Sequence, residues 1–154
     1  MIWGIDLGVR SVHVAGLDDD THVAETFTVK PQVVRTLELD ALAKSLRALI
    51  GPEDDVFVEE PPLAGPRNLS TFAALNQVLG MVLATVGGRE ANVMQWKRDV
   101  CGSGNTDKLG VSRWLQDHHP TYFAQCSGDQ NLVDATCIAL YGRLVLARVV
   151  VLWE

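Results

Sequence analysis

The start of the chain constrains the fold more than any other part, because it places an acid inside an apolar strand. Asp6 lies in the segment 2–8, whose other residues are apolar or glycine. A carboxylate in a buried strand lowers stability unless a donor or a cation pairs with it. Gly8 permits a tight turn or the close approach of a ligand, and a second strand-like run covers 11–17. This segment predicts a hairpin whose acid is either satisfied by hydrogen bonds or binds a metal.

The following segments predict that this hairpin belongs to a mixed sheet. Residues 21–29 alternate in polarity and favour a third strand, which completes an antiparallel meander. A helix over 38–50 and a short apolar strand at 56–59 come next. This order indicates a crossover that sets the fourth strand parallel to the first.

The second half of the chain predicts mostly helices. We expect, in order, a loop at 61–66, a long apolar helix at 69–86, a fifth strand at 91–96, a loop at 101–105, a helix from the cap residue Thr106 to about His118, and a final helix over 130–150. The predicted fold is α/β: a mixed five-stranded sheet, formed by a three-strand meander plus two parallel strands, with helices on both faces. A single domain over 1–154 is expected.

Composition limits the compartment and the partners. Residues 1–15 lack the basic start and the long apolar core of a signal peptide. The apolar stretches are shorter than a membrane span requires. We therefore expect a cytoplasmic protein without membrane contact. The three cysteines lack C-x-x-C spacing, which argues against a disulfide framework or a zinc site. The net charge of −6 argues against nucleic acid, but residues 89–113 carry five basic side chains against three acids.

Three acids share an unusual position at the ends of apolar elements: Asp6, Glu59 and Asp134. Adjacent parallel strands would bring Asp6 and Glu59 together at their carboxyl ends, and a packed helix could add Asp134. Clustered carboxylates repel one another and suit a hard cation such as Mg²⁺ or Mn²⁺. Two such ions, roughly 3.5–4 Å apart, can activate water and stabilise the leaving oxygen in phosphodiester cleavage.

The sequence leaves two choices open at this predicted site. Glu59 and Glu60 point to opposite faces of their strand, and the apolar residues 56–58 do not show which face is inward. Asn131 lies three residues before Asp134 on the same helical face. Asp129 is either a further ligand or the N-cap of the last helix.

The segments that carry these acids, residues 3–8, 57–60 and 134–139, resemble the motifs of the RuvC-like Holliday junction resolvases, of the ribonuclease H-like nuclease superfamily. Residues 96–108 resemble the family's lysine-containing strand, glycine loop and second lysine. The resemblance covers nearly the whole chain in order, and the short chain is similar to a phage-encoded member.

The resemblance implies an Mg²⁺- or Mn²⁺-dependent endonuclease that hydrolyses phosphodiester bonds and resolves four-way junctions. Carried over by position, Asp6, Glu59 and Asp134 would bind two metal ions, and Lys108 would contact the scissile region. The family usually has Asp or His where Asn131 stands, so either Asn131 is a weaker ligand, Asp129 substitutes, or one metal binds loosely.

The resemblance also implies a homodimer on branched DNA. The apolar helix at 69–86 is our candidate for a two-fold contact, and an ordinary core helix is the alternative. The expected phosphate contacts are Arg67, Lys97, Arg98, Lys108 and Arg113.

Three other functions remain open at this point. One is a nuclease of the same fold that cuts flaps or RNA–DNA hybrids, and another is a non-catalytic junction-binding protein. The third is an actin-like ATPase or sugar kinase, whose first strand also carries Asp-Leu-Gly before a hairpin. That class needs two lobes around a nucleotide, and a chain of 154 residues holds one.

Overall fold

The hairpin at the start of the chain forms the centre of a five-stranded sheet. The computed structural model describes residues 1–28, 35–61 and 69–151. Its strand order is β3-β2-β1-β4-β5, with β1–β2 and β2–β3 antiparallel and β1–β4 and β4–β5 parallel. The strands are β1 (Ile2–Leu7), β2 (Ser11–Leu17), β3 (His22–Thr28), β4 (Asp55–Glu59) and β5 (Arg89–Ala91). The predicted α/β fold with a mixed five-stranded sheet is confirmed.

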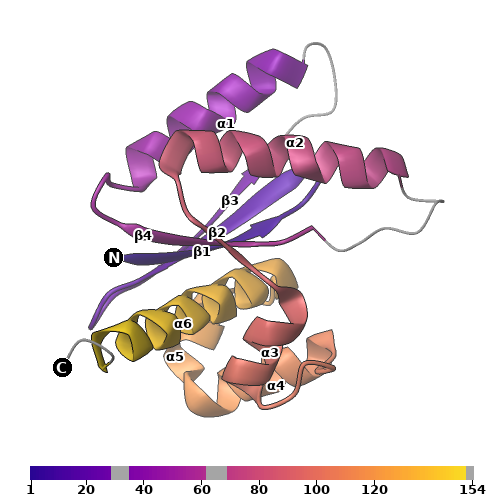
Figure 1. Ribbon diagram of the computed structural model, residues 1–154. Coiled ribbons are helices and arrows are strands. Elements are labelled where there is room, and N and C mark those ends of the chain that lie inside the picture. Colours follow the sequence, from indigo (N-terminus) through magenta and orange to yellow (C-terminus); the bar gives the residue numbers. More distant parts are fainter. Residues whose placement is uncertain (29–34, 62–68, 152–154) are drawn as a thin grey trace.

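Helices cover both faces of this sheet (Figure 1). On one face lie α1 (Arg35–Leu49) and α2 (Leu69–Val86), and on the other lie α3 (Val93–Cys101), α4 (Lys108–His118), α5 (Pro120–Gln125) and α6 (Gln130–Val151). Each layer has its own apolar core. Trp3 and Ile5 pack with α1 and α2, whereas Phe57 and Leu17 pack with the α6 side.

The approach of α6 to β1 depends on a glycine in the first strand. A Cβ at Gly4 would collide with the carbonyl oxygen of Ala135 and the amide nitrogen of Ala139. Because no side chain intervenes, the first turns of α6 lie directly against the central strand. This contact brings Asp134 toward the end of β1 that carries Asp6.

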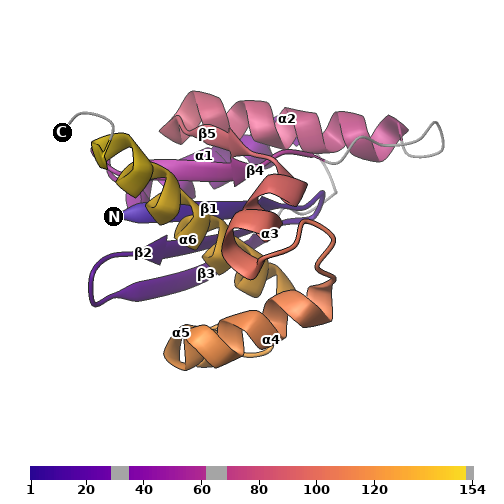
Figure 2. The ribbon, with the colours of Figure 1, turned by 60° about the horizontal axis from the view of Figure 1, so that its bottom comes forward.

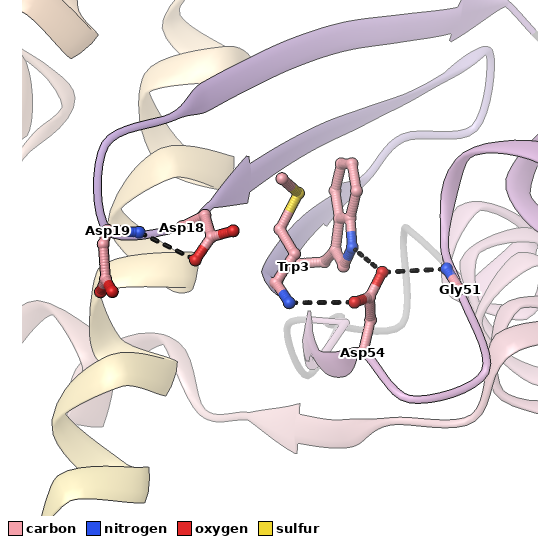
Figure 3. Close-up of polar contacts among 6 residues, drawn as sticks. Trp3, Asp18, Asp19, Gly51 and Asp54 are labelled. Atoms are coloured by element: carbon pink, nitrogen blue, oxygen red, sulfur yellow. Dashed lines mark hydrogen bonds and ion pairs between the residues drawn. The ribbon is translucent and has the colours of Figure 1, made fainter.

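At the opposite end of the same strands, Asp54 ties β1 to β4 (Figure 3). Its carboxylate accepts hydrogen bonds from the Met1 amino group at 3.0 Å, the Trp3 indole Nε1 at 2.8 Å and the Gly51 amide at 2.9 Å. Burial alone would raise the pKa of Asp54, but these donors outweigh it and hold the pKa below its ordinary value. This carboxylate is thus satisfied by the fold itself.

The prediction of a strand over 91–96 is wrong. Strand β5 ends at Ala91, and Asn92 caps a helix by accepting a hydrogen bond from the Gln95 amide at 3.2 Å. Lys97 therefore lies on α3 and not on a strand. A short apolar run does not distinguish strand from helix by periodicity, and the cap at Asn92 decides it.

Two further boundaries differ from expectation. The cap of α4 is Asp107, whose Oδ1 accepts from the Gly110 amide at 2.7 Å, whereas the Thr106 hydroxyl donates to the Ser103 carbonyl at 2.6 Å. Helix α5 was not predicted. Its first residue, Pro120, suits a helix start because proline lacks the N–H that would be unpaired there.

Helix α2 has the predicted bounds but is much less buried than a core helix. Only Val78, Leu79 and Val82 are buried along its described length. By length and composition α2 could cross a membrane, contrary to the expectation that no stretch is apolar enough, although the helix of a soluble protein can pass the same test. Most of the apolar surface of α2 is therefore not covered by the described part of the chain.

Candidate active site

A polar pocket of about 290 Å³ lies where the carboxyl ends of β1 and β4 meet the start of α6. Asp6 is the next-to-last residue of β1, Glu59 is the last residue of β4, and Asp134 lies in the second turn of α6. All three line the pocket, together with Lys97, Lys108 and Asn131. The structure thus brings together the three acids that the sequence singled out.

These carboxylates lack the donors that satisfy Asp54. Burial, with the nearby charges of Glu59 and Asp134, raises the pKa of Asp6 to about 8. Burial and the charge of Asp134 raise the pKa of Glu59 to about 7. Burial also raises the pKa of Asp134, although a hydrogen bond from the Gln130 side-chain Nε2 at 3.2 Å opposes this. Near neutral pH the group therefore favours protons or another source of positive charge.

Two lysines supply part of that charge. Lys108, the first residue of α4, lowers the pKa of all three carboxyls, and Lys97 on α3 lowers those of Glu59 and Asp134. The lysines do not offset the effect of burial, since all three pKa values stay above their ordinary range. The buried indole nitrogen of Trp96 lacks a well-formed hydrogen bond, although its proximity lowers the pKa of Glu59.

The structure shows which of the two adjacent glutamates faces the pocket. Glu59 lines it, whereas the Glu60 carboxylate accepts a hydrogen bond from the Asn92 side chain at 3.1 Å and lines a separate groove. The alternation of side chains along the strand did not show which glutamate faces inward. The packing around the end of β4 decides it in favour of Glu59.

Asn131 and Asp129 have different positions. Asn131 lines the pocket beside Asp134. Asp129 caps α6, because its Oδ1 accepts from the amides of Asn131 at 2.9 Å and Leu132 at 3.4 Å. Its charge nevertheless contributes to the raised pKa of Asp6. Asp129 is therefore the N-cap of α6. Asn131 is the better placed of the two to offer an oxygen to the pocket.

His13 was missed by the sequence analysis. It pairs with Asp6 across the β1–β2 register, so both side chains lie on the same face of the sheet, and it lines the pocket while only 4% exposed. Its Nε2 lies 3.6 Å from Asp129, and its Nδ1 is buried without a partner. Burial lowers the pKa of His13, although Asp129 opposes this. The only signal was a polar residue within the apolar run 12–17.

The other predicted DNA contacts do not line this pocket. Arg98 donates to its neighbour Asp99 at 3.1 Å, and Arg113 is exposed on α4. Arg67 lies outside the described residues. Among the described residues, Lys97 and Lys108 are therefore the two basic side chains of this set that line the pocket.

The pocket has the oxygen ligands that a hard cation needs, but these oxygens are too far apart to bind one ion together. Three carboxylates and one amide offer oxygen ligands, and their raised pKa values show that added positive charge would be favourable. Within residues 1–28, 35–61 and 69–151, no three His, Cys, Asp or Glu side chains are grouped closely enough to hold one ion. Metal binding would therefore draw these side chains together.

Comparison with known proteins supports the assignment of the fold. The sequence matches no protein-family model and no curated protein. Among solved structures, the chain is similar to Thermus thermophilus RuvC in complex with a Holliday junction substrate, with a TM-score of 0.62 and 19% identity over 92% of each chain. It is also similar to a second Thermus thermophilus RuvC structure, with a TM-score of 0.57 and 21% identity over 92% of each chain. These similarities show that the chain has a RuvC-like fold.

Proposed function

We propose that this protein is a metal-dependent endonuclease that resolves four-way DNA junctions. The observation that carries this proposal is the pocket formed by Asp6, Glu59 and Asp134, whose carboxyl pKa values are all raised. The fold supports it, because a RuvC of this fold has a structure with Holliday junction substrate. A sugar kinase or actin-like ATPase is not favoured, since the chain matches RuvC over 92% of its length.

In this proposal Asp6, Glu59 and Asp134 would hold Mg²⁺ or Mn²⁺, with two ions in each pocket, and Asn131 would add a neutral oxygen. When bound, such ions lower the pKa of water and stabilise the charge that develops on the phosphate. Lys108 would contact the scissile region and stabilise negative charge there, and Lys97 would approach the DNA backbone. Leu7, Leu75 and Trp96 form apolar parts of the pocket wall.

The decisive experiment offers the purified protein several DNA substrates with Mg²⁺ or Mn²⁺. We expect paired nicks at symmetric positions in a synthetic four-way junction. Preferred cutting of a flap or an RNA–DNA hybrid would assign the other nuclease function. Junction binding without cleavage in either metal would favour a non-catalytic binding protein.

Junction binding should also depend steeply on salt, because contact with backbone phosphates releases counterions. We expect the affinity to fall by at least tenfold between 50 and 200 mM salt, as measured by fluorescence anisotropy of a labelled junction. An affinity that does not change over this range would contradict phosphate-dominated binding by an acidic protein.

We also propose that the exposed face of α2 pairs with a second copy, which would present two pockets to the two strands of a junction. Leu69 is 62% exposed, and a Cβ at Gly80 would meet no atom within 4 Å. Glycine within an exposed helix costs roughly 1 kcal/mol relative to alanine, so a close helix contact would explain it. Gly80→Glu should give a monomer in sedimentation and lose paired nicking, with Gly80→Ser as the control for substitution itself.

A further inference from the structure

A second pocket lies outside the carboxylate site, between α3, α4 and α6. Its volume is about 350 Å³, and its walls include Trp114, His119 and Arg143. Figure 2 shows α3, α4 and α6 together on one face of the sheet, and residues of these helices line the pocket. Arg143 lies nine residues after Asp134 on α6, or about 13 Å along the helix axis. The proposed cleavage reaction uses none of these three residues.

We propose that this pocket binds a nucleotide, with the base stacked on the Trp114 ring and the phosphate on Arg143. The His119 ring, tilted by 53° to Trp114 with the two centroids 5.8 Å apart, would contact the edge of the base. Bases bind proteins through stacking on aromatic rings, and guanidinium groups bind phosphate with two parallel hydrogen bonds. The pocket combines both kinds of group in a volume that suits a small planar ligand.

The aromatic walls are held in place before any ligand enters. The rings of Trp114 and His118 stack with centroids 4.5 Å apart, and those of His119 and Tyr122 stack at 5.2 Å with an interplanar angle of 6°. The backbone of His119 is fixed at the junction of α4 and α5, because its amide donates to the Leu115 carbonyl at 2.8 Å and its carbonyl accepts from the Phe123 amide at 3.0 Å. Ordered rings lose little entropy when a base stacks on them.

The charge around the pocket also suits a nucleotide. Burial and the nearby charges of His118 and Arg143 lower the pKa of His119, so its ring is largely neutral at pH 7. The Arg143 guanidinium donates to the Asp18 carbonyl at 3.0 Å, which orients it and uses one of its five N–H donors.

The acid at the pocket is already compensated. Asp99 accepts from Arg98 at 3.1 Å and from Arg148 at 3.0 Å, and these contacts hold its pKa low despite the opposing effect of burial. Its negative charge is therefore matched by two arginines, and Arg143 adds a further positive charge next to the aromatic walls.

The test uses two probes, dAMP and a labelled deoxyadenosine trinucleotide, titrated against the full chain in EDTA so that cleavage is blocked. We expect both Arg143→Gln and His119→Ala to weaken binding by about tenfold. Arg47→Gln on α1, outside both pockets, should bind like the unmodified protein. Circular dichroism melting checks that each variant is folded.

Each outcome decides the proposal. If dAMP binds, a free nucleotide is sufficient as the ligand. If the trinucleotide binds and dAMP does not, the ligand is an unpaired nucleotide within a DNA strand. The proposal is overturned if neither probe binds, if both pocket variants bind normally, or if an abasic trinucleotide binds as tightly as the intact one. The proposal stands without cleavage activity, so its failure and that of the nuclease proposal are separate results.

Discussion

The two ends of β1 and β4 hold carboxylates in opposite situations. At one end, Asp54 receives three donors, and its pKa lies below the ordinary value. At the other end, Asp6 and Glu59 face a third acid, and their pKa values are raised to about 8 and 7. The fold satisfies the first carboxylate by itself, whereas the second group needs positive charge from outside. This difference separates a structural acid from a candidate ligand on the same pair of strands.

The largest effect should come from removing the charge of Asp6. We expect Asp6→Asn to lower the cleavage rate by at least a thousandfold, because the acid shared by the proposed metal sites is lost. Junction affinity in EDTA should persist. The matched variant Asp54→Asn should keep its cleavage rate when assayed below its melting temperature. Full cleavage by Asp6→Asn would show that the two ends do not differ in function.

A smaller loss is expected when the positive charge in the pocket is removed. Lys108→Met should lower the cleavage rate by about a hundredfold, as for other groups that stabilise charge in a transition state. Rates measured against pH should shift as well, because Lys108 lowers the pKa of all three carboxyls. Lys44→Met on α1, a residue paired with Asp40 at the surface, is the control and should leave the rate unchanged.

The stability of the metal-free protein should fall as pH rises. The folded-state pKa of Asp6 is about 8 against 3.8 for the free group, so the native state keeps a proton that the unfolded chain releases. This stabilisation is complete below pH 4 and is lost as pH rises to about 8. We expect urea unfolding in EDTA to show a loss of roughly 4 kcal/mol from pH 5 to pH 9, about 1.4 kcal/mol for each pH unit up to the folded-state pKa. Asp6→Asn should flatten this dependence, and an unchanged slope would contradict it.

The smallest expected effect is the loss of stability in Asp54→Asn. Its amide cannot accept from the three donors as the carboxylate does, so we expect the free energy of unfolding to fall by about 1 kcal/mol at pH 7. In metal-free protein at pH 8, Asp6→Asn should raise the same quantity. Opposite signs for two identical substitutions, measured by urea unfolding, would confirm the contrast between the two ends.

The sequence predicted most of the sheet because hydrophobic runs and alternation depend on local spacing. The bounds of β1, β2 and α2 follow directly from such patterns. The segment 91–96 failed because six residues are too few to separate a strand from a capped helix. The choice between Glu59 and Glu60 stayed open for a related reason: both faces of β4 are covered, so the apolar run does not show which face is inward.

The candidate site was predicted in part. Asp6, Glu59 and Asp134 stood out because an acid next to a buried apolar run is unusual. His13 did not, because its place opposite Asp6 depends on the register between β1 and β2. The metal, the role of each ligand and the dimer stay predictions.

By itself, the sequence determined most of the elements and which acids stand at their ends, since both depend largely on neighbours along the chain. Only the tertiary structure decided that Asp6, Glu59 and Asp134 share one pocket, that Asp129 caps α6, and that Trp114 and Arg143 line a common second pocket. The physical reason is that charge coupling and burial depend on distances between segments far apart in the chain. A pattern of residues does not contain those distances.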